Sequence, residues 1–225
     1  MYKWKGTELS SKGIIVEKKP TISKGKKKIK TYDIEGRNGF LSIDTGVYEP
    51  FEVSLECHLD TSVANLDEVK EFLDGYGTLQ FEADRQYTAI VNNAIPFEVV
   101  ATKFRSFIIQ FLVNPIAEST TNYQISPVGT QTVTIDAATT MYPLILATFT
   151  DTADLTINGT TLTLEKTGSN VFYLDCKNQE VYDSSHNNMS EYMSGDFPTL
   201  KPGTNTISYT TPSAAYTINY RKTYF

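Results

Sequence analysis

The chain has 225 residues, of which 40% are hydrophobic and 20% charged, with 14 Tyr and 12 Phe. This length suits one large β domain or two ordinary domains, and the apolar content excludes an intrinsically disordered chain. The formal net charge of −6 argues against direct nucleic-acid recognition, because general nucleic-acid binders usually carry a net basic face.

Strand patterns dominate the first part of the chain. Short apolar or alternating runs predict strands at 13–18, 29–39, 78–83, 86–95 and 104–113. The clearest alternation is FEVSLECHL at 51–59, whose apolar residues share one face of the strand. Its polar residues, including Glu52, Glu56 and His58, share the other face.

The lysine run between Lys24 and Lys28 lies among these first strands. We interpret it as the tip of a hairpin, where the lysine charges keep the exposed turn soluble. It could instead meet an acidic surface of a neighbouring protein, or nucleic acid passing close by. The GRNG sequence at 36–39 predicts a turn and lacks the context of a phosphate-binding loop.

Only one segment, NLDEVKEFLDGYG at 65–77, predicts a helix, near residues 66–74. Its apolar residues fall at helical spacing. Asn65 with Glu68 resembles a capping box, and Gly75 can take the left-handed conformation that ends a helix. A helix of about two turns must pack its apolar face on a sheet to be stable.

A change of composition marks a predicted domain boundary. Asn114-Pro115 is expected to break the chain, and residues 116–128 are polar. Up to Pro115 the chain holds 15 Lys or Arg and 16 Asp or Glu, whereas the remainder holds 5 and 10. We therefore predict an N-terminal domain over 1–118 and a C-terminal domain over 119–225.

The second half predicts short strands separated by turns, at 130–137, 142–149, 154–166, 170–176, 180–183, 204–210 and 214–222. The almost continuous apolar run YPLILATF at 142–149 favours a central strand. Asn158-Gly159 between two alternating runs predicts a hairpin. Frequent turns without a helical period indicate a β-sandwich. The loop in GDFPTLKPGTNTISY at 195–209 is read as a turn before a late strand, with a sugar-binding lip or a docking surface as alternatives.

Localisation and redox state follow from what the sequence lacks. The first 20 residues have no apolar signal-peptide core, and no window approaches the roughly 18 apolar residues of a membrane span. We expect a protein made in the cytoplasm, with no signal peptide and no membrane partner. Cys57 and Cys176 are expected to be buried reduced thiols, with a disulfide between distant domains left open.

Catalytic chemistry finds little support. His58 and His186 fall in no metal-ligand pattern, and no CxxC or HExxH motif occurs. Glu52 and Glu56 share a strand face, but their Cα atoms should lie about 13 Å apart, which exceeds the usual spacing of a glycosidase acid/base pair. The acids between Asp175 and Asp183 lack EF-hand spacing. We predict no enzyme, no catalytic residue, no metal and no cofactor.

Carbohydrate binding through the second half is the main alternative function. Lectin-like sandwiches often stack a sugar on an exposed aromatic side chain. The candidates for that platform are Tyr173, Tyr182, Tyr192 and the sole tryptophan, Trp4. Trp4 lies in the other half, which weakens the case.

Three segments together resemble the distal tail protein (Dit) family of siphophages that infect Gram-positive bacteria. The first is YDIEGRNGFLSIDTGVYEPFEVSLECHL at 32–59, with a Gly-Arg-x-Gly turn before an alternating strand. The second is NLDEVKEFLDGYGTLQFEADRQYTAIVNNAIPFE at 65–98, where a short helix leads into two strands. The third combines YPLILATFTDTADLTINGTTLTLE at 142–165 with MSGDFPTLKPGTNTISY at 193–209. Each motif is weak alone, and their order along nearly the whole chain carries the resemblance.

The resemblance implies a fold and a role. The fold is mainly β, with an N-terminal split β-barrel or sandwich carrying one short helix and a C-terminal galectin-like β-sandwich. The role is a distal tail hub of a phage or prophage. Its N-terminal domains form a hexameric ring that joins the tail tube protein to the tail-associated tip protein and the baseplate. Receptor-binding proteins are a further class of partner in this family.

The chain departs from the family in being short, with no inserted carbohydrate-binding module and no long arm for holding receptor-binding proteins. These departures argue against a direct role in gripping the host or peripheral baseplate parts. A sugar-binding module is the second hypothesis, favoured by an exposed aromatic platform in a groove. An enzyme such as a wall hydrolase is the third, favoured by a pair of perturbed carboxylates in a cleft.

Overall fold

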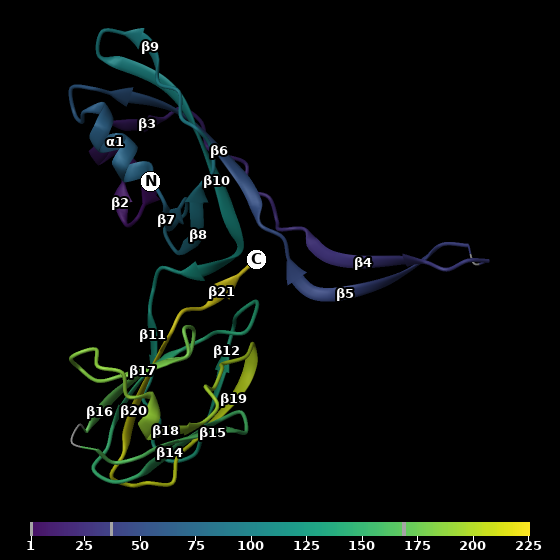
Figure 1. Ribbon diagram of the computed structural model, residues 1–225, viewed down its shortest axis with the longest axis vertical. Helices are drawn as coiled ribbons and strands as arrows, with labels where there is room; N and C mark the ends of the chain where they lie inside the picture. The colour runs from purple at the N-terminus through teal and green to yellow at the C-terminus, as the bar shows by residue number, and fades with distance from the viewer. Residues whose placement is uncertain (1, 37, 168–169) are drawn as a thin grey trace. The chain divides into compact units, whose positions relative to one another are not determined.

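A computed structural model describes residues 2–36, 38–167 and 170–225. The chain divides into two compact units, Met1–Ala117 together with Phe225, and Glu118–Tyr224. We call these the N-terminal unit and the C-terminal unit. The fold is mainly β, as predicted (Figure 1). In the described part of the chain, no helix has the length and apolar character required to cross a membrane.

The N-terminal unit is built on a curled antiparallel sheet in the order β2-β1-β7-β8-β10-β6-β3, with β9 also paired with β10. Two further strands, β4 and β5, form a separate two-stranded sheet. The elements are β1 Lys3–Trp4, β2 Thr7–Glu8, the 3-10 helix η1 Leu9–Lys12, β3 Ile14–Val16, β4 Lys27–Asp33, β5 Phe40–Tyr48, β6 Phe51–Asp60, α1 Leu66–Leu73, β7 Tyr76–Gln80, β8 Arg85–Val91, β9 Glu98–Ala101 and β10 Phe104–Ser119.

Strand β6 shows why the sheet has one packed face. Val53, Leu55, Cys57 and Leu59 are all buried, as the alternation predicts. The strand pairs antiparallel with β10 from Phe51↔Val113 to Asp60↔Phe104. Apolar residues of both strands therefore line the same side of the sheet, and their removal from water stabilises the unit.

Helix α1 begins and ends close to its predicted limits. The Asn65 side chain accepts a hydrogen bond from the Glu68 backbone N–H at 2.8 Å, and its Nδ2 donates to Glu68 Oε1 at 2.8 Å. Val69 and Leu73 are buried. The indole Nε1 of Trp4 donates to the carbonyl of Phe72 at 3.0 Å. The helix is thus fixed by its cap, its apolar face and a hydrogen bond from the buried tryptophan.

Replacing Asn65 with alanine is expected to lower the unfolding free energy of the N-terminal unit by about 1 kcal/mol, because a helix N–H loses its acceptor. Urea denaturation followed by Trp4 fluorescence measures this, since Trp4 is the sole tryptophan and lies in this unit. Glu71→Ala, an exposed position inside the helix, is the control. Equal midpoints for the two variants would contradict the role of the cap.

Strand β10 corrects one sequence expectation. Asn114-Pro115 does not break the chain, because β10 runs through both residues to Ser119. The pairing of β10 with β6 ends at Val113, so the missing N–H of Pro115 falls outside that ladder. The boundary between the two units lies within this strand.

The described residues of the C-terminal unit form two five-stranded antiparallel sheets, and β21 lies outside both. One has the order β11-β20-β13-β16-β17 and the other β12-β19-β14-β15-β18. The elements are β11 Tyr123–Ile125, β12 Gln131–Ile135, β13 Leu144–Thr148, β14 Ala153–Ile157, β15 Thr160–Leu164, β16 Val171–Asp175, β17 Glu180–Tyr182, the 3-10 helix η2 Ser190–Tyr192, β18 Met193–Gly195, β19 Gly203–Ser208, β20 Ala215–Tyr220 and β21 Thr223–Tyr224.

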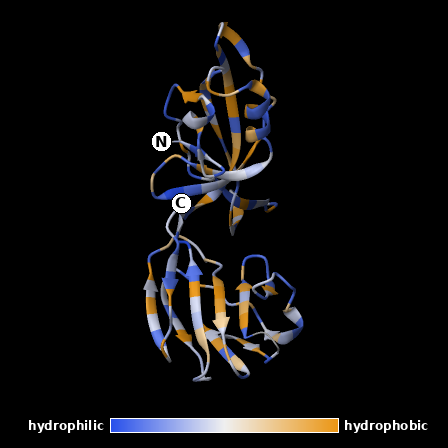
Figure 2. Cartoon of the chain, turned by 90° about the vertical axis from the view of Figure 1, so that its left-hand side faces the viewer, coloured by the Kyte–Doolittle hydropathy of each residue, from blue (hydrophilic) through white to orange (hydrophobic). Residues whose placement is uncertain are grey.

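An apolar cluster lies between these sheets. It joins Ile145 and Phe172 of the first sheet to Leu155 and Ile207 of the second, all 0% exposed. Figure 2 shows the hydrophobic and hydrophilic residues interleaved along these strands. The predicted sandwich is therefore confirmed, and β13 is the middle strand of its sheet, as its apolar run indicates.

The predicted Asn-Gly hairpin is present between β14 and β15. Asn158 and Gly159 have φ values of 52° and 84°, which suits the left-handed two-residue turn that Asn-Gly favours. The Asn158 side chain also donates to Asn205 Oδ1 at 2.8 Å and to the Thr199 carbonyl at 3.1 Å. This turn therefore fixes the stretch at 195–209 from a distance in sequence.

Candidate functional site

The two histidines that the sequence analysis considered lie in different units. His58 Nε2 lies 2.8 Å from Glu17 Oε1 in the N-terminal unit. His186 belongs to the C-terminal unit, where its ring lies 4.8 Å from that of Tyr182. Among the described residues, no group of three or more His, Cys, Asp or Glu could hold a metal ion.

The carboxylates singled out in the sequence have structural surroundings. Glu52 and Glu56 are exposed on the outer face of β6, opposite Leu112 and Ile108 of β10. Neither lies in an enclosed cleft with the other, as an acid/base pair would need.

Asp175 and Asp183 each close a turn of the C-terminal unit. Asp175 Oδ1 accepts from the backbone N–H groups of Lys177 and Asn178. Asp183 Oδ1 accepts from Ser185 and Asn187, and a hydrogen bond from the Asn187 side chain is the main reason that its pKa is lowered. These carboxylates hold loops in shape.

The two cysteines are buried free thiols, as predicted, one in each unit. Burial is the main cause that raises the pKa of both Cys57 and Cys176 to about 12. Each side chain is therefore protonated near neutral pH and does not act as a nucleophile there.

The proposed sugar platform is only partly supported. Trp4 is 0% exposed and its ring lies 4.9 Å from that of Phe111, so the expectation that it offers a stacking surface is wrong. Tyr192 packs against the core of the C-terminal unit. Tyr173 and Tyr182 stack on one another at 5.4 Å and 6°, so each ring has one face covered by the other.

A polar recess of about 400 Å³ lies beside Tyr182. It is lined by Asp175, Glu180, Val181, Tyr182, His186, Asn188 and Ser190. The recess places hydrogen-bonding groups next to an aromatic ring, and a sugar can bind to a surface of this kind.

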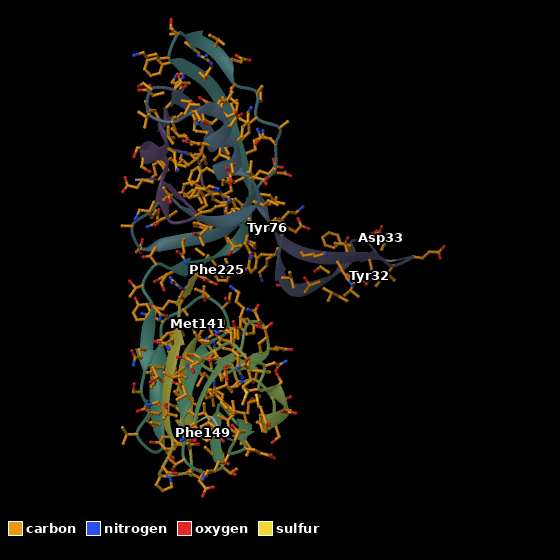
Figure 3. All side chains as sticks on the ribbon, turned by 60° about the vertical axis from the view of Figure 1, so that its left-hand side comes forward. Tyr32, Asp33, Tyr76, Met141, Phe149 and Phe225 are labelled. Atoms are coloured by element: carbon orange, nitrogen blue, oxygen red, sulfur yellow. The ribbon has the colours of Figure 1, made fainter. Side chains whose placement is uncertain are left out.

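The most unusual surface of the molecule is the β4–β5 hairpin. All seven residues of β4 are exposed, and so are most of β5. Figure 1 shows the two strands extending away from the sheet of their own unit, and Figure 3 shows Tyr32 and Asp33 on them. The hairpin is therefore a projecting element of the N-terminal unit.

One face of the hairpin is apolar. Tyr32 pairs with Leu41 and Lys30 with Ile43, which places these four side chains on the same side. Leu41 is 47% exposed and Ile43 is 48% exposed. We call Tyr32, Leu41 and Ile43 the apolar hairpin face. The opposite side mixes Ile29 and Phe40 with polar partners.

The lysine run lies elsewhere than predicted. Lys27 and Lys28 belong to the start of β4 and the turn lies between Asp33 and Phe40, so the run is at the base of the hairpin. Arg37 of the GRNG turn is outside the described residues. Lys27 Nζ lies 2.5 Å from Asp44 Oδ2, and this hydrogen bond raises the pKa of Lys27 and lowers that of Asp44.

Sequence reasoning missed strand β5 and thereby the hairpin itself. The available signal was the glycine turn at 36–39 between the strand pattern at 29–35 and the run FLSIDTGVY at 40–48. Read together, these indicate two strands joined by a turn.

The C-terminal unit matches a known protein family, and the whole chain is similar to a solved structure. The family described as siphovirus-type tail component, C-terminal domain, matches residues 117–224. The crystal structure of the SPP1 Dit (gp 19.1) protein, titled a paradigm of hub adsorption apparatus in Gram-positive infecting phages, is similar with a TM-score of 0.75. That likeness covers 100% of this chain and 98% of the other at 12% identity. No curated protein matches the sequence.

Proposed function

We propose that this chain, a siphovirus tail component of the Dit family, forms a hexameric ring that joins the tail tube to the tip or baseplate and its host-adsorption proteins. It acts as a structural protein of the virion tail rather than as an enzyme. Its partners are copies of itself, the tail tube protein and the tail-associated tip protein, with receptor-binding proteins as a further class. The protein is made in the cytoplasm of the host bacterium from a phage or prophage genome.

The observation that carries the ring is the apolar hairpin face. A two-stranded hairpin is marginally stable in water by itself. This one nevertheless exposes Tyr32, Leu41 and Ile43 on one side. Contiguous exposed apolar side chains of this kind mark interaction surfaces. A partner that covers the face would both remove it from water and stabilise the hairpin.

A second copy of the chain is the partner that this geometry favours. The hairpin extends from one side of its unit and offers a surface that differs from the sheet it leaves. Contact of one copy's hairpin with a different surface of the next copy is heterologous, and such contacts close into a ring when the rotation between copies permits. Six copies is the number that the family resemblance implies.

The mass of the full chain in solution tests the ring. Six copies of the 25.2 kDa chain give about 151 kDa, which light scattering over a range of concentrations distinguishes from a monomer. We expect the hexamer, or its appearance when the tail tube or tip protein is added. A chain that stays at the monomer mass with both partners present would contradict the proposal.

Carbohydrate binding through the C-terminal unit is the second candidate. The recess beside Tyr182, with Asp175, Asn188 and Ser190 in its wall, is the observation that favours it. The mutual stacking of Tyr173 and Tyr182 weighs against it, because it leaves less aromatic surface for a sugar ring. A screen against cell-wall glycans is the direct test of this candidate.

A further inference from the structure

The base of the hairpin is held by several contacts at the point where both strands enter the N-terminal unit. Glu49 N–H donates to the Lys26 carbonyl at 2.8 Å, which joins the incoming and outgoing segments. Gly25 is buried against Pro115 of β10. A Cβ at Gly25 would lie 2.4 Å from Pro115 Cβ and 3.1 Å from the Glu49 carbonyl oxygen, so only glycine permits this approach.

Phe225 completes the base although it is far from the hairpin in sequence. By its contacts it belongs to the N-terminal unit. Its ring lies 5.0 Å from that of Tyr48 at the end of β5. Lys24 Nζ lies 5.2 Å from the Phe225 ring and 5.9 Å from the Tyr48 ring, which is within the range of cation–π attraction. Figure 3 labels Phe225.

We propose that Phe225 is a positioning residue, which with Tyr48 and Lys24 clamps the base of the hairpin and fixes the direction in which it leaves its unit. Beyond this base, the hairpin forms a separate sheet with exposed side chains. Its direction is therefore set by the contacts at residues 24–27 and 48–49.

A fixed direction matters for assembly, and this step rests on the proposed ring. A hairpin that samples many directions must be ordered when it meets the next copy, and that ordering reduces affinity. A hairpin held in one direction avoids this cost. Because a closed ring repeats the same contact, a small loss of affinity at each hairpin contact weakens the whole assembly.

The clamp is tested first in the monomer, by the distance between spin labels on the hairpin and on the sheet. Labels are placed through Ser42→Cys on β5 and Ser54→Cys on β6, two exposed positions. The native thiols are buried with pKa values raised to about 12, so they do not compete for the label at neutral pH. The measurement uses the full chain, diluted until light scattering shows monomer.

Phe225→Ala is expected to broaden the distance distribution roughly twofold, because the hairpin then samples more directions. Phe225→Trp should restore a narrow distribution, since it keeps a ring against Tyr48 and Lys24. Lys24→Met, which removes the cation but keeps an apolar stem, should give an intermediate width and covers the case in which Phe225→Ala does not fold. Tyr76→Ala removes an exposed aromatic of the same unit, 75% exposed, and should change nothing.

Ring assembly is the second readout. Phe225→Ala should raise the concentration at half-assembly about tenfold relative to the unaltered chain, with Tyr76→Ala as the control. An unchanged distance distribution in Phe225→Ala and Lys24→Met would overturn the clamp. If the distribution broadens but the unaltered chain never exceeds the monomer mass with its tail partners, the clamp stands and the proposed ring fails.

Discussion

The double substitution Leu41→Asp and Ile43→Asp is expected to abolish ring assembly while both units stay folded. Both side chains lie on the apolar hairpin face and are about half exposed in the single chain, so aspartate is tolerated there before assembly. In the ring the same positions would be covered, and burying two unpaired carboxylates is strongly unfavourable. Light scattering at micromolar concentration should then give the mass of one chain.

The matched control places the same charge on the other side of the hairpin. Thr31 and Ser42 pair with each other and face away from Leu41 and Ile43. Thr31→Asp with Ser42→Asp therefore adds the same two charges to the same strands. If the ring persists in the Leu41 and Ile43 variant, the apolar hairpin face is not the contact. If only the control variant fails to form the ring, the contact lies on the opposite face of the hairpin.

The lysine run offers a separate comparison. Replacing Lys26, Lys27 and Lys28 with serine tests whether charge at the base drives the contact with a neighbour. These side chains are exposed, and exposed ion pairs contribute little. We expect the serine variant to assemble. If the serine variant fails to assemble, and added salt also prevents assembly of the unaltered chain, the contact depends on charge.

Much of the fold follows from local sequence patterns. The alternation at 51–59 correctly predicts the buried face of β6, because a strand with one packed side must repeat every two residues. Asn65 and Asn158-Gly159 correctly predict a helix start and a hairpin turn, since few residues satisfy those backbone conformations. The order of such segments also predicted a likeness to the Dit family. Residues 117–224 match the siphovirus-type tail component family, and the fold is similar to that of the SPP1 Dit protein.

The errors have physical causes that a local pattern cannot reveal. Pro115 reads as a break because it lacks an N–H, and only the register shows that β10 no longer pairs with β6 there. Trp4 reads as a possible platform because it is an aromatic side chain, but it is 0% exposed, packs against the Phe111 ring and donates a hydrogen bond to the Phe72 carbonyl.

The candidate interaction surface was harder to predict than the core. Its residues are apolar, as core residues are, and only the structure shows that no element of the chain's described part covers Tyr32, Leu41 and Ile43. Phe225 lies far in sequence from Lys24 and Tyr48, so no periodicity links them. An interaction surface leaves no spacing rule of the kind that metal ligands or capping residues do.

Asn205→Ala is expected to lower the unfolding free energy of the C-terminal unit by about 3 kcal/mol, since buried hydrogen-bonding groups are left without partners. Asn205 is 0% exposed. Its Oδ1 accepts from Asn158 Nδ2 and from the Lys201 N–H, each at 2.8 Å. Its Nδ2 donates to the carbonyls of Lys201 and Gly203 at 2.8 and 3.1 Å. Alanine removes all four hydrogen bonds and leaves a small cavity.

Pulsed thiol labelling in urea separates the two units in one experiment. Cys57 reports the N-terminal unit and Cys176 the C-terminal unit, because each is buried and reacts only when its unit opens. In Asn205→Ala, Cys176 should be labelled at a lower urea concentration while Cys57 is unchanged. Asn178→Ala, an exposed asparagine of the same unit, should shift Cys176 far less. Equal shifts for these two variants would show that the network around Asn205 does not hold the 195–209 stretch in place.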